Sequence, residues 1–322
     1  MKTFLKVFFS SIGILIMVLA LAWIGLSVAK YILYEEYLDG KEDVCTIPDL
    51  NRGFTPQGIT WLAEEDAYLH SGYQGDALAL YYVKGDDVRR FVPLDENGAP
   101  GKGHGGGVTS YGDYVYIADN HALLVYRLSE LLAAKDGDSL GLVMRIPVDN
   151  SASFCSARDG KLFVGEFYRA GNYETDASHA FLTPEGEENR AIVSCYTIRE
   201  DGSLEAIPDY WLSVPGLVQG FAMYDGVIAL SRSYGLQSSS LEFYSGMLDT
   251  GKTAPYTERA VPVYYVGSAN LQQKLALPAF SEDLDIQDGK VIISFESACN
   301  KYIIGKFFFA FEAAAYPVPQ AE

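Results

Sequence analysis

The sequence predicts an all-β protein, a β-propeller that follows a single N-terminal transmembrane helix. Three observations lead to this prediction. A long uncharged run lies near the start of the chain, short alternating segments separated by Gly/Asp turns fill the remainder, and five pairs of these segments resemble one another. The chain has no long stretch of 3.6-residue periodicity after residue 40, which excludes helical bundles and parallel α/β folds.

The first predicted element is a membrane-spanning helix over residues 7–29. These residues carry no charge, and as a helix they would extend about 34 Å, which is enough to cross a bilayer. Lys2 and Lys6 precede the run, whereas Lys30 is soon followed by acidic residues. The positive-inside bias therefore places residues 1–6 in the cytoplasm and the rest of the chain outside the cell.

This orientation divides the chain into a signal anchor, a juxtamembrane linker at 30–42, an extracellular propeller at 43–316 and a C-terminal tail at 317–322. A cleaved signal peptide, which would make the protein secreted, is the alternative. Ser27 and Ala29 are small residues at a suitable spacing for cleavage, but a signal peptide has an apolar region of only about 7–15 residues.

The composition narrows the possible partners and the redox chemistry. The 322 residues include 42 acidic and 24 basic side chains, giving a net charge of −18. Such a surface repels phosphate backbones, so we expect no nucleic-acid partner. In an oxidising compartment the four cysteines allow up to two disulfides, and buried free thiols are equally compatible with the sequence. These cysteines are Cys45, Cys155, Cys195 and Cys299.

Five similar hairpins form the predicted repeat. They lie at 57–73, 106–120, 153–167, 219–233 and 282–297. Their turn residues are separated by 47, 47, 66 and 63 residues, near the period of about 40–50 expected for propeller blades. Five blades fit this spacing best, and six are the alternative if the two longer intervals conceal another unit. A β-sandwich would not require such a recurrent hairpin.

Outer strands complete the four-stranded units. Alternating segments at 76–83, 88–94, 122–128, 141–148 and 191–198 supply them.

The other predicted elements connect or close these units. A strand near Val44–Ile47 would complete the last blade, formed by residues 281–316. Ser129–Lys135 and Asn270–Leu275 are predicted as helical turns, and 170–190 as a long polar loop.

Several of these segments resemble a known group of proteins. The runs TPQGITW (55–61), GHGGGVTSYGDYVYIADN (103–120), SRSYG (231–235) and ISFESA (293–298) are similar to those of uncharacterised secreted or membrane-anchored bacterial propellers. That group is distantly similar to the strictosidine synthase, gluconolactonase and paraoxonase-like superfamily. The resemblance implies a propeller over the whole extracellular part. It also suggests comparison with the superfamily's Ca²⁺-dependent lactonases, whose Glu, Asn and Asp ligands lie at the central funnel.

Propeller ligands bind over the central channel, where inner strands start and second strands end. We therefore expect a small molecule, a glycan or a peptide to bind there. The predicted ligand-binding residues are Gln57, Tyr73, Asn120, Gln219, Arg232 and Ser233.

Three charged residues interrupt otherwise apolar strands. Glu166, Arg232 and Glu296 would be costly to bury without a partner. They are predicted to form a substrate site, or a structural ion pair in which Arg232 binds one of the two glutamates.

A predicted Ca²⁺ site would use Glu282, Asp283 and Asp285, together with Asn120, which lies about where a funnel Asn is expected. Their oxygens are the ligands that Ca²⁺ prefers. The alternative is a hydrogen-bonded strand opening without metal, since carboxylates also cap turns. Gln57 stands where the lactonases have an acid.

The glycine-rich run at 101–107 matches a dinucleotide fingerprint and resembles an esterase oxyanion segment. An alternating strand follows it, so neither a helix N-terminus nor a nucleophile elbow is available. Its glycines instead predict close packing at a narrow channel. His104 within the run is a candidate base or ligand residue.

The sequence thus favours a membrane-anchored extracellular propeller that binds its ligand at the central funnel. One alternative is a Ca²⁺-dependent hydrolase, lactonase-like or esterase-like, with His104 or Glu166 as base. A second is a glycan-cleaving enzyme that uses Glu166 and Glu296 as paired carboxylates.

Overall fold

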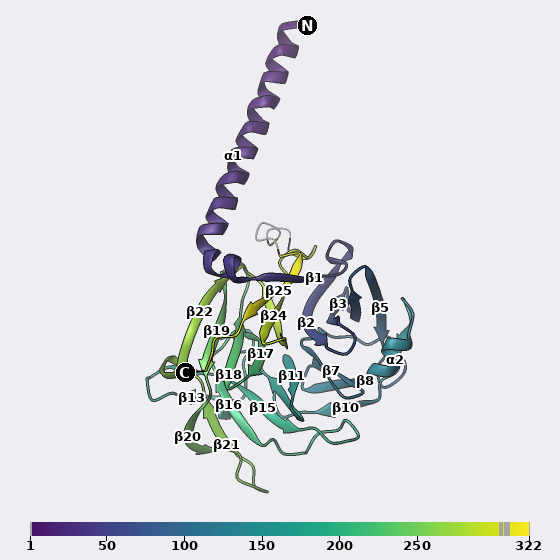
Figure 1. Ribbon diagram of the computed structural model, residues 1–322, viewed down its shortest axis with the longest axis vertical. Helices are drawn as coiled ribbons and strands as arrows, with labels where there is room; N and C mark the ends of the chain where they lie inside the picture. The colour runs from purple at the N-terminus through teal and green to yellow at the C-terminus, as the bar shows by residue number, and fades with distance from the viewer. Residues whose placement is uncertain (1, 303–304, 306–309, 322) are drawn as a thin grey trace.

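Five blades, each of four antiparallel strands, surround a central channel and form a five-bladed β-propeller (Figure 1). The computed structural model describes residues 2–302, 305 and 310–321. The inner strands of neighbouring blades contact one another in a closed ring, in the order β2, β6, β11, β17 and β23. The predicted fold class is confirmed, with five blades and not six.

The blades contain the following strands, given from the channel outward. Blade 1 has β2 (Phe54–Leu62), β3 (Ala67–Gln74), β4 (Ala77–Lys84) and β5 (Asp87–Pro93). Blade 2 has β6 (Val108–Tyr111), β7 (Tyr114–Asp119), β8 (Ala122–Arg127) and β10 (Met144–Pro147). Blade 3 has β11 (Phe154–Arg158), β12 (Lys161–Gly165), β15 (Ala191–Thr197) and β16 (Tyr210–Val214). Blade 4 has β17 (Val218–Tyr224), β18 (Val227–Arg232), β19 (Ser239–Ser245) and β22 (Leu271–Leu277).

Blade 5 is closed by a strand from the beginning of the domain. Its strands are β23 (Ser281–Gln287), β24 (Lys290–Phe295), β25 (Glu312–Pro317) and, outermost, β1 (Glu42–Thr46). Strand β1 pairs antiparallel with β25, so that Glu42 lies opposite Ala315 and Thr46 opposite Glu312. The predicted closing strand near Val44–Ile47 is therefore confirmed.

The five predicted hairpins are the inner strand pairs of the five blades. The two long intervals between them do not conceal a sixth blade. One contains the 170–190 segment. The other contains β20 (Leu248–Thr253) and β21 (Pro262–Tyr265), which leave blade 4 and extend the sheet of blade 3 through the parallel pairing of β21 with β16.

Close packing of the inner strands explains glycines at two junctions between neighbouring blades. A Cβ atom on Gly58 would lie 2.6 Å from the backbone nitrogen of Val108, and one on Gly107 would lie 2.5 Å from that of Cys155. Side chains at these positions would push neighbouring blades apart. The expectation that the glycine-rich run permits close packing is confirmed at Gly107.

The connecting segments agree only in part with the sequence predictions. The helical turn expected at Ser129–Lys135 is α2 (Leu128–Ala133). The one expected at Asn270–Leu275 is wrong, because Leu271–Leu277 forms strand β22 and pairs with β19. The 170–190 loop contains a 3₁₀ turn, η2 (Ala177–His179), and a small hairpin of β13 (Phe181–Leu182) and β14 (Glu188–Asn189).

The remaining short elements are β9 (Ser139–Leu140), which extends blade 1, and two 3₁₀ turns, η1 (Leu50–Arg52) and η3 (Ser268–Asn270). All four cysteines are free thiols, and three of them are buried. The fourth, Cys45, lies with its sulfur 3.4 Å from Nε2 of His70 on blade 1.

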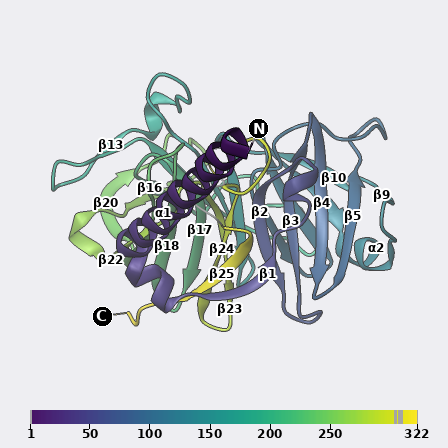
Figure 2. The same cartoon turned by 90° about the horizontal axis from the view of Figure 1, so that it is seen from above.

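Helix α1 (Lys2–Gly40) is long and apolar enough to cross a membrane, and its candidate span begins at Ser11. The helix kinks at Tyr34, whose φ and ψ are −124° and 22°. After the kink it packs against β22 and β25. Figure 2 shows α1 leaving the propeller on the side of these two strands. The residues expected as a linker, 30–42, are therefore mostly helical.

Two tyrosines hold the end of α1 on the propeller. Tyr34 and Tyr37 are each 2% exposed. The Tyr34 hydroxyl lies 3.0 Å from Oγ of Ser238, and the Tyr37 ring lies 6.2 Å from that of Phe295 and 6.4 Å from that of Tyr316. The apolar helix is thus joined to the propeller by a packed junction.

Candidate functional site

The candidate site lies at the end of the channel where the inner strands start and the second strands of the blades end, here called the channel mouth. Three inner strands carry a β-bulge at this end, at Pro56/Gly58, Val218/Gly220 and Ser281/Leu284. A bulge leaves its extra residue out of the ladder and changes the direction of that side chain. Gln57 and Gln219 occupy two of these positions, and Glu282 and Asp283 the third.

Two buried carboxyl groups meet at the channel mouth. Glu282 and Glu296 are 3% and 7% exposed, and their side chains are hydrogen bonded to each other. Nε2 of Gln57 on blade 1 donates to Oε2 of Glu296 at 3.0 Å. The bulge in β2 therefore brings an amide of blade 1 onto a carboxyl of blade 5.

This pair holds a proton that ordinary glutamates would have lost. Burial raises the pKa of Glu282 well above its usual range, and the neighbouring Glu296 raises it further. Burial also raises the pKa of Glu296, to about 7, although Lys301 acts in the opposite direction. Two carboxyls in contact cannot both ionise easily, so the pair retains at least one proton at neutral pH.

Polar and aromatic side chains surround this pair. Lys301 donates to the Tyr73 hydroxyl and is also hydrogen bonded to Tyr302, whose hydroxyl in turn bonds Glu296. The rings of Tyr73 and His104 lie 5.1 Å apart at 31°. We call the whole group the carboxyl site, which comprises Gln57, Tyr73, His104, Glu282, Glu296, Lys301 and Tyr302.

The glycine-rich loop positions His104. Oδ1 of Asp119 accepts hydrogen bonds from the backbone nitrogens of His104 at 3.1 Å and Gly105 at 3.5 Å. Gly103 has a φ of 141°, and a Cβ there would lie 2.2 Å from Oδ1 of Asp119. The loop thus wraps around one carboxylate and leaves the His104 side chain exposed beside Tyr73.

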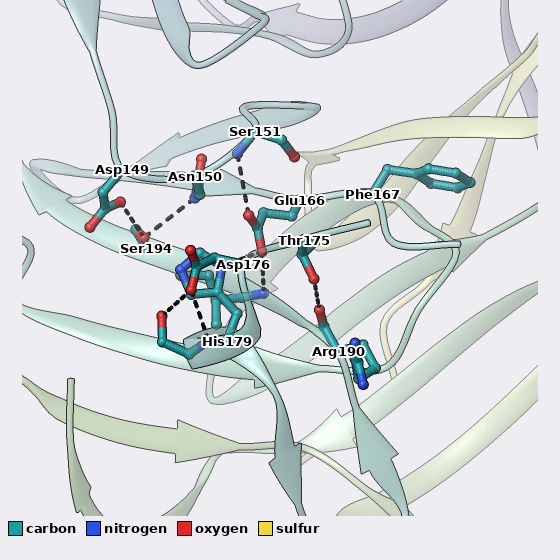
Figure 3. A network of polar contacts seen from close by, with 12 residues as sticks. Asp149, Asn150, Ser151, Glu166, Phe167, Thr175, Asp176, His179, Arg190 and Ser194 are labelled. Carbon is teal, nitrogen blue, oxygen red and sulfur yellow. Dashed lines mark hydrogen bonds and ion pairs between the residues drawn. The ribbon is translucent and has the colours of Figure 1, made fainter. Parts of the chain in front are cut away.

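Glu166 belongs to a different cluster (Figure 3). It is 2% exposed and accepts from Nδ1 of His179 at 2.9 Å and from the backbone nitrogens of Ser151 and Ile192 at 3.3 and 3.2 Å. Burial lowers the pKa of His179, but the bond to Glu166 outweighs this effect and the pKa is raised. Glu166 therefore fixes the 170–190 segment to blade 3.

Arg232 pairs with neither Glu166 nor Glu296. Its Nη1 lies 2.9 Å from Oε1 of Glu242, which also binds Lys274 at 2.8 Å and the Tyr244 hydroxyl at 2.6 Å. Sequence reasoning missed Glu242, although it interrupts an apolar strand just as Glu166 does. The Arg232 cluster lies within blade 4, so the predicted pairing of Arg232 with Glu166 or Glu296 is wrong.

The predicted Ca²⁺ ligands do not converge. Asp283 is fully buried and its Oδ2 accepts from the backbone nitrogens of Ile59 at 3.4 Å and Val108 at 3.2 Å, so it joins blades 1, 2 and 5. Asp285 binds Thr60 and Trp61 of blade 1, at 2.6 and 2.8 Å.

The other two predicted ligands also lie apart. Glu282 faces Glu296, and Asn120 is exposed in the β7–β8 turn with a φ of 43°. Across the described part of the chain, no three His, Cys, Asp or Glu side chains form a group that could hold a metal ion. These residues therefore do not fit the Ca²⁺ site of the lactonases.

The remaining predicted residues lie at the mouth without joining the carboxyl site. Gln219 is half-buried at the bulge of β17. Ser233 is buried, and its Oγ accepts from that of Ser239 at 2.9 Å. A cavity of about 680 Å³ lies elsewhere, between residues 46–52 and the outer strands of blade 1, and it includes no predicted site residue.

No protein-family model matches the chain, and no curated protein matches its sequence. Similar solved structures include a luciferin-regenerating enzyme, with 8% identity, a TM-score of 0.41 and coverage of 87% of this chain and 99% of that one. A putative oxidoreductase (glucose dehydrogenase) from Thermus thermophilus has 10% identity and a TM-score of 0.42, over 85% and 98% of the two chains.

A GH43_1 enzyme from Xanthomonas citri has 12% identity and a TM-score of 0.42, over 86% of this chain and 89% of that one. Such low identities and scores do not indicate a shared activity. The propeller assignment stands on the strand pairing of this chain.

Proposed function

We propose that the protein is a membrane-anchored propeller whose carboxyl site binds a hydroxyl-rich small molecule, such as a sugar, at the channel mouth. The hydrogen-bonded pair of Glu282 and Glu296 is the observation that carries this proposal. Buried carboxyls are costly unless paired, and these two retain a proton beside Lys301, Tyr302 and the half-buried Tyr73.

The chemistry of the site suits hydroxyl groups. A carboxyl pair that retains a proton can both donate and accept hydrogen bonds, as each sugar hydroxyl does. Gln57 holds Glu296 in place, and Lys301 and Tyr302 add further donors. The rings of Tyr73 and His104 add an apolar face beside these groups.

Binding is favoured over glycan cleavage by the spacing of the carboxyls. Glycosidases keep their two carboxyls about 5 Å or more apart, so that the sugar or a water fits between them. Glu282 and Glu296 are instead in direct contact, and Glu166 is held by three hydrogen bonds in blade 3. The alternative of a Ca²⁺-dependent hydrolase has no converging ligand set among the described residues to support it.

The location of the propeller outside the cytoplasm is part of the proposal. Lys2 and Lys6 precede the apolar run of α1, which supports a cytoplasmic N-terminus and an extracellular site. Motifs such as TPQGITW and ISFESA support membership in the uncharacterised group of bacterial propellers.

The test is a binding screen on the full-length protein in detergent. Monosaccharides and sugar alcohols are screened by saturation-transfer NMR, and hits are titrated against Glu296→Gln and the control Glu188→Gln, whose side chain is 62% exposed. We expect saturable binding that weakens at least tenfold in Glu296→Gln and is unchanged in the control. Binding by no compound in the screen, or equal affinity in Glu296→Gln, would refute the proposal.

A further inference from the structure

A cluster of aromatic side chains lies on blades 3 and 4, apart from the carboxyl site. The Phe167 ring lies 5.3 Å from that of Tyr173 at 81°, and 6.3 Å from that of Tyr234 at 27°. The guanidinium of Arg169 lies 3.9 Å from the centre of the Tyr234 ring. Tyr173 and Tyr234 are 51% and 39% exposed. We call Phe167, Arg169, Tyr173 and Tyr234 the aromatic platform.

The platform occupies the channel mouth on the two blades that the carboxyl site does not use. Phe167 lies just beyond the end of β12 and Tyr234 just beyond the end of β18, as Tyr73 lies at the end of β3. The carboxyl site is built from residues of blades 5 and 1 and from the loop that leads into blade 2, and blades 3 and 4 complete the ring. Figure 3 shows Phe167 pointing away from the Glu166 cluster.

Backbone hydrogen bonds fix the segments that carry these rings. The nitrogen of Leu217 donates to the carbonyl of Tyr168 at 2.9 Å, and the nitrogen of Ser233 donates to the carbonyl of Leu217 at 2.9 Å. Arg169 and Tyr173 exchange two backbone bonds of 2.9 Å. The platform is therefore held in one shape before any ligand arrives, which lowers the entropy lost on binding.

We propose that the aromatic platform is a second sugar subsite and that the natural ligand is an oligosaccharide reaching across the channel mouth. This inference rests on the proposed function, because it extends the ligand bound at the carboxyl site. The Arg169 guanidinium covers one face of the Tyr234 ring, so the apolar surface left for the C–H face of a sugar is that of Tyr173 and the open part of Tyr234. The tyrosine hydroxyls beside it offer hydrogen bonds to the edge of the sugar.

The charge of the protein selects among oligosaccharides. A net charge of −18 opposes the approach of polyanionic glycans. A neutral or amino-sugar oligosaccharide suits these surroundings. A bilayer surface or a second copy of the chain are other possible occupants of exposed aromatic rings, and the experiment separates them.

The experiment measures binding of cellohexaose, xylohexaose and chitohexaose, and of their monosaccharides, to the full-length protein in detergent by calorimetry. We expect at least one hexasaccharide to bind at least tenfold more tightly than its monosaccharide. Tyr234→Ala should remove most of this gain and leave monosaccharide affinity unchanged, whereas Tyr234→Phe should keep it. Glu296→Gln should weaken both ligands. Tyr111→Ala is the matched control, since Tyr111 is 41% exposed in the β6–β7 hairpin.

The outcomes separate this inference from the proposed function. If monosaccharides bind but no hexasaccharide binds more tightly, or if Tyr234→Ala leaves hexasaccharide affinity unchanged, the platform is not a subsite while the carboxyl site stands. If neither class binds, the proposed function fails as well. If Tyr234→Ala reduces only vesicle binding or self-association, the platform contacts a membrane or another copy, and the inference is overturned.

Discussion

Glu282 and Glu296 are hydrogen bonded to each other at the channel mouth, the first near the start of β23 and the second directly after the end of β24. Strands β23 and β24 pair antiparallel, so the start of the first meets the end of the second. The hairpin therefore forces the two carboxyls together, and burial makes them retain a proton.

The first prediction concerns the pH dependence of stability. The pKa of Glu296 is raised from 4.5 to about 7, so the folded state binds this proton more tightly than the unfolded state. Its stabilising contribution is complete below about pH 4.5 and is lost as the pH rises to about 7. Replacing Glu296 by Gln should remove this loss, which amounts to a few kcal/mol at most.

Urea unfolding of the wild type and Glu296→Gln between pH 4.5 and 8 measures the difference. The variant should gain stability over the wild type as the pH rises through this window. A constant difference across the window would show that the carboxyl does not titrate there.

The second prediction separates a structural from a catalytic role for Glu166. Glu166→Ala leaves His179 and two backbone nitrogens without their shared acceptor, so the free energy of unfolding should fall by about 3 kcal/mol. Limited proteolysis should then cut within 170–190. The control Glu188→Ala removes an exposed ion pair with Arg190 and should cost less than about 0.5 kcal/mol. Unchanged stability in Glu166→Ala would contradict the anchoring role.

The inner hairpins could be predicted from sequence because each encodes its own alternation and turn. Strand β22 could not be predicted in this way, because its sequence LQQKLAL places Leu271 and Leu275 at a helical spacing of four residues. Pairing with β19 overrides that local preference.

The sequence predicts a site where the blades converge. Five residues of the carboxyl site were therefore among the predicted site residues, namely Gln57, Tyr73, His104, Glu282 and Glu296. Their grouping depends on bulges and on which blades are neighbours. Neither the positions of the bulges nor the identity of the neighbouring blades follows from a recognisable sequence pattern. The partners of Glu166 and Arg232 were missed because His179 lies in a loop and Glu242 in a different strand.

The third prediction concerns the junction between α1 and the propeller. Tyr37→Ala would leave a cavity between the rings of Phe295 and Tyr316, so the free energy of unfolding should fall by about 3 kcal/mol. Tyr31→Ala is the matched control because Tyr31 is 47% exposed. Thermal unfolding in detergent compares the two. Equal melting temperatures would show that the helix end does not contribute to stability.

The fourth prediction tests closure of the ring by β1. Chains that begin at Lys30, Lys41 and Ile47 remove in turn the span, the docked helix end and the closing strand. The first chain should have a melting temperature close to that of the full-length protein. The melting temperature of the second should be somewhat lower. The third should aggregate or lose cooperative unfolding, because β25 becomes an unpaired edge. A cooperative transition in the third chain would show that closure does not need β1.

The fifth prediction concerns calcium. Because Asp283 and Asp285 are hydrogen bonded to separate backbone groups, millimolar Ca²⁺ or EDTA should shift the melting temperature by less than about 1 °C. A larger rise with Ca²⁺ that is reversed by EDTA would restore the metal-dependent alternative.

The pairing of β1 with β25 also has a consequence for biosynthesis. Thr46 leaves the ribosome first, whereas its partner Glu312 is made near the end of translation. At roughly 5–20 residues per second, the first strand waits for tens of seconds before the ring can close. Until then the nascent protein has two open strand edges.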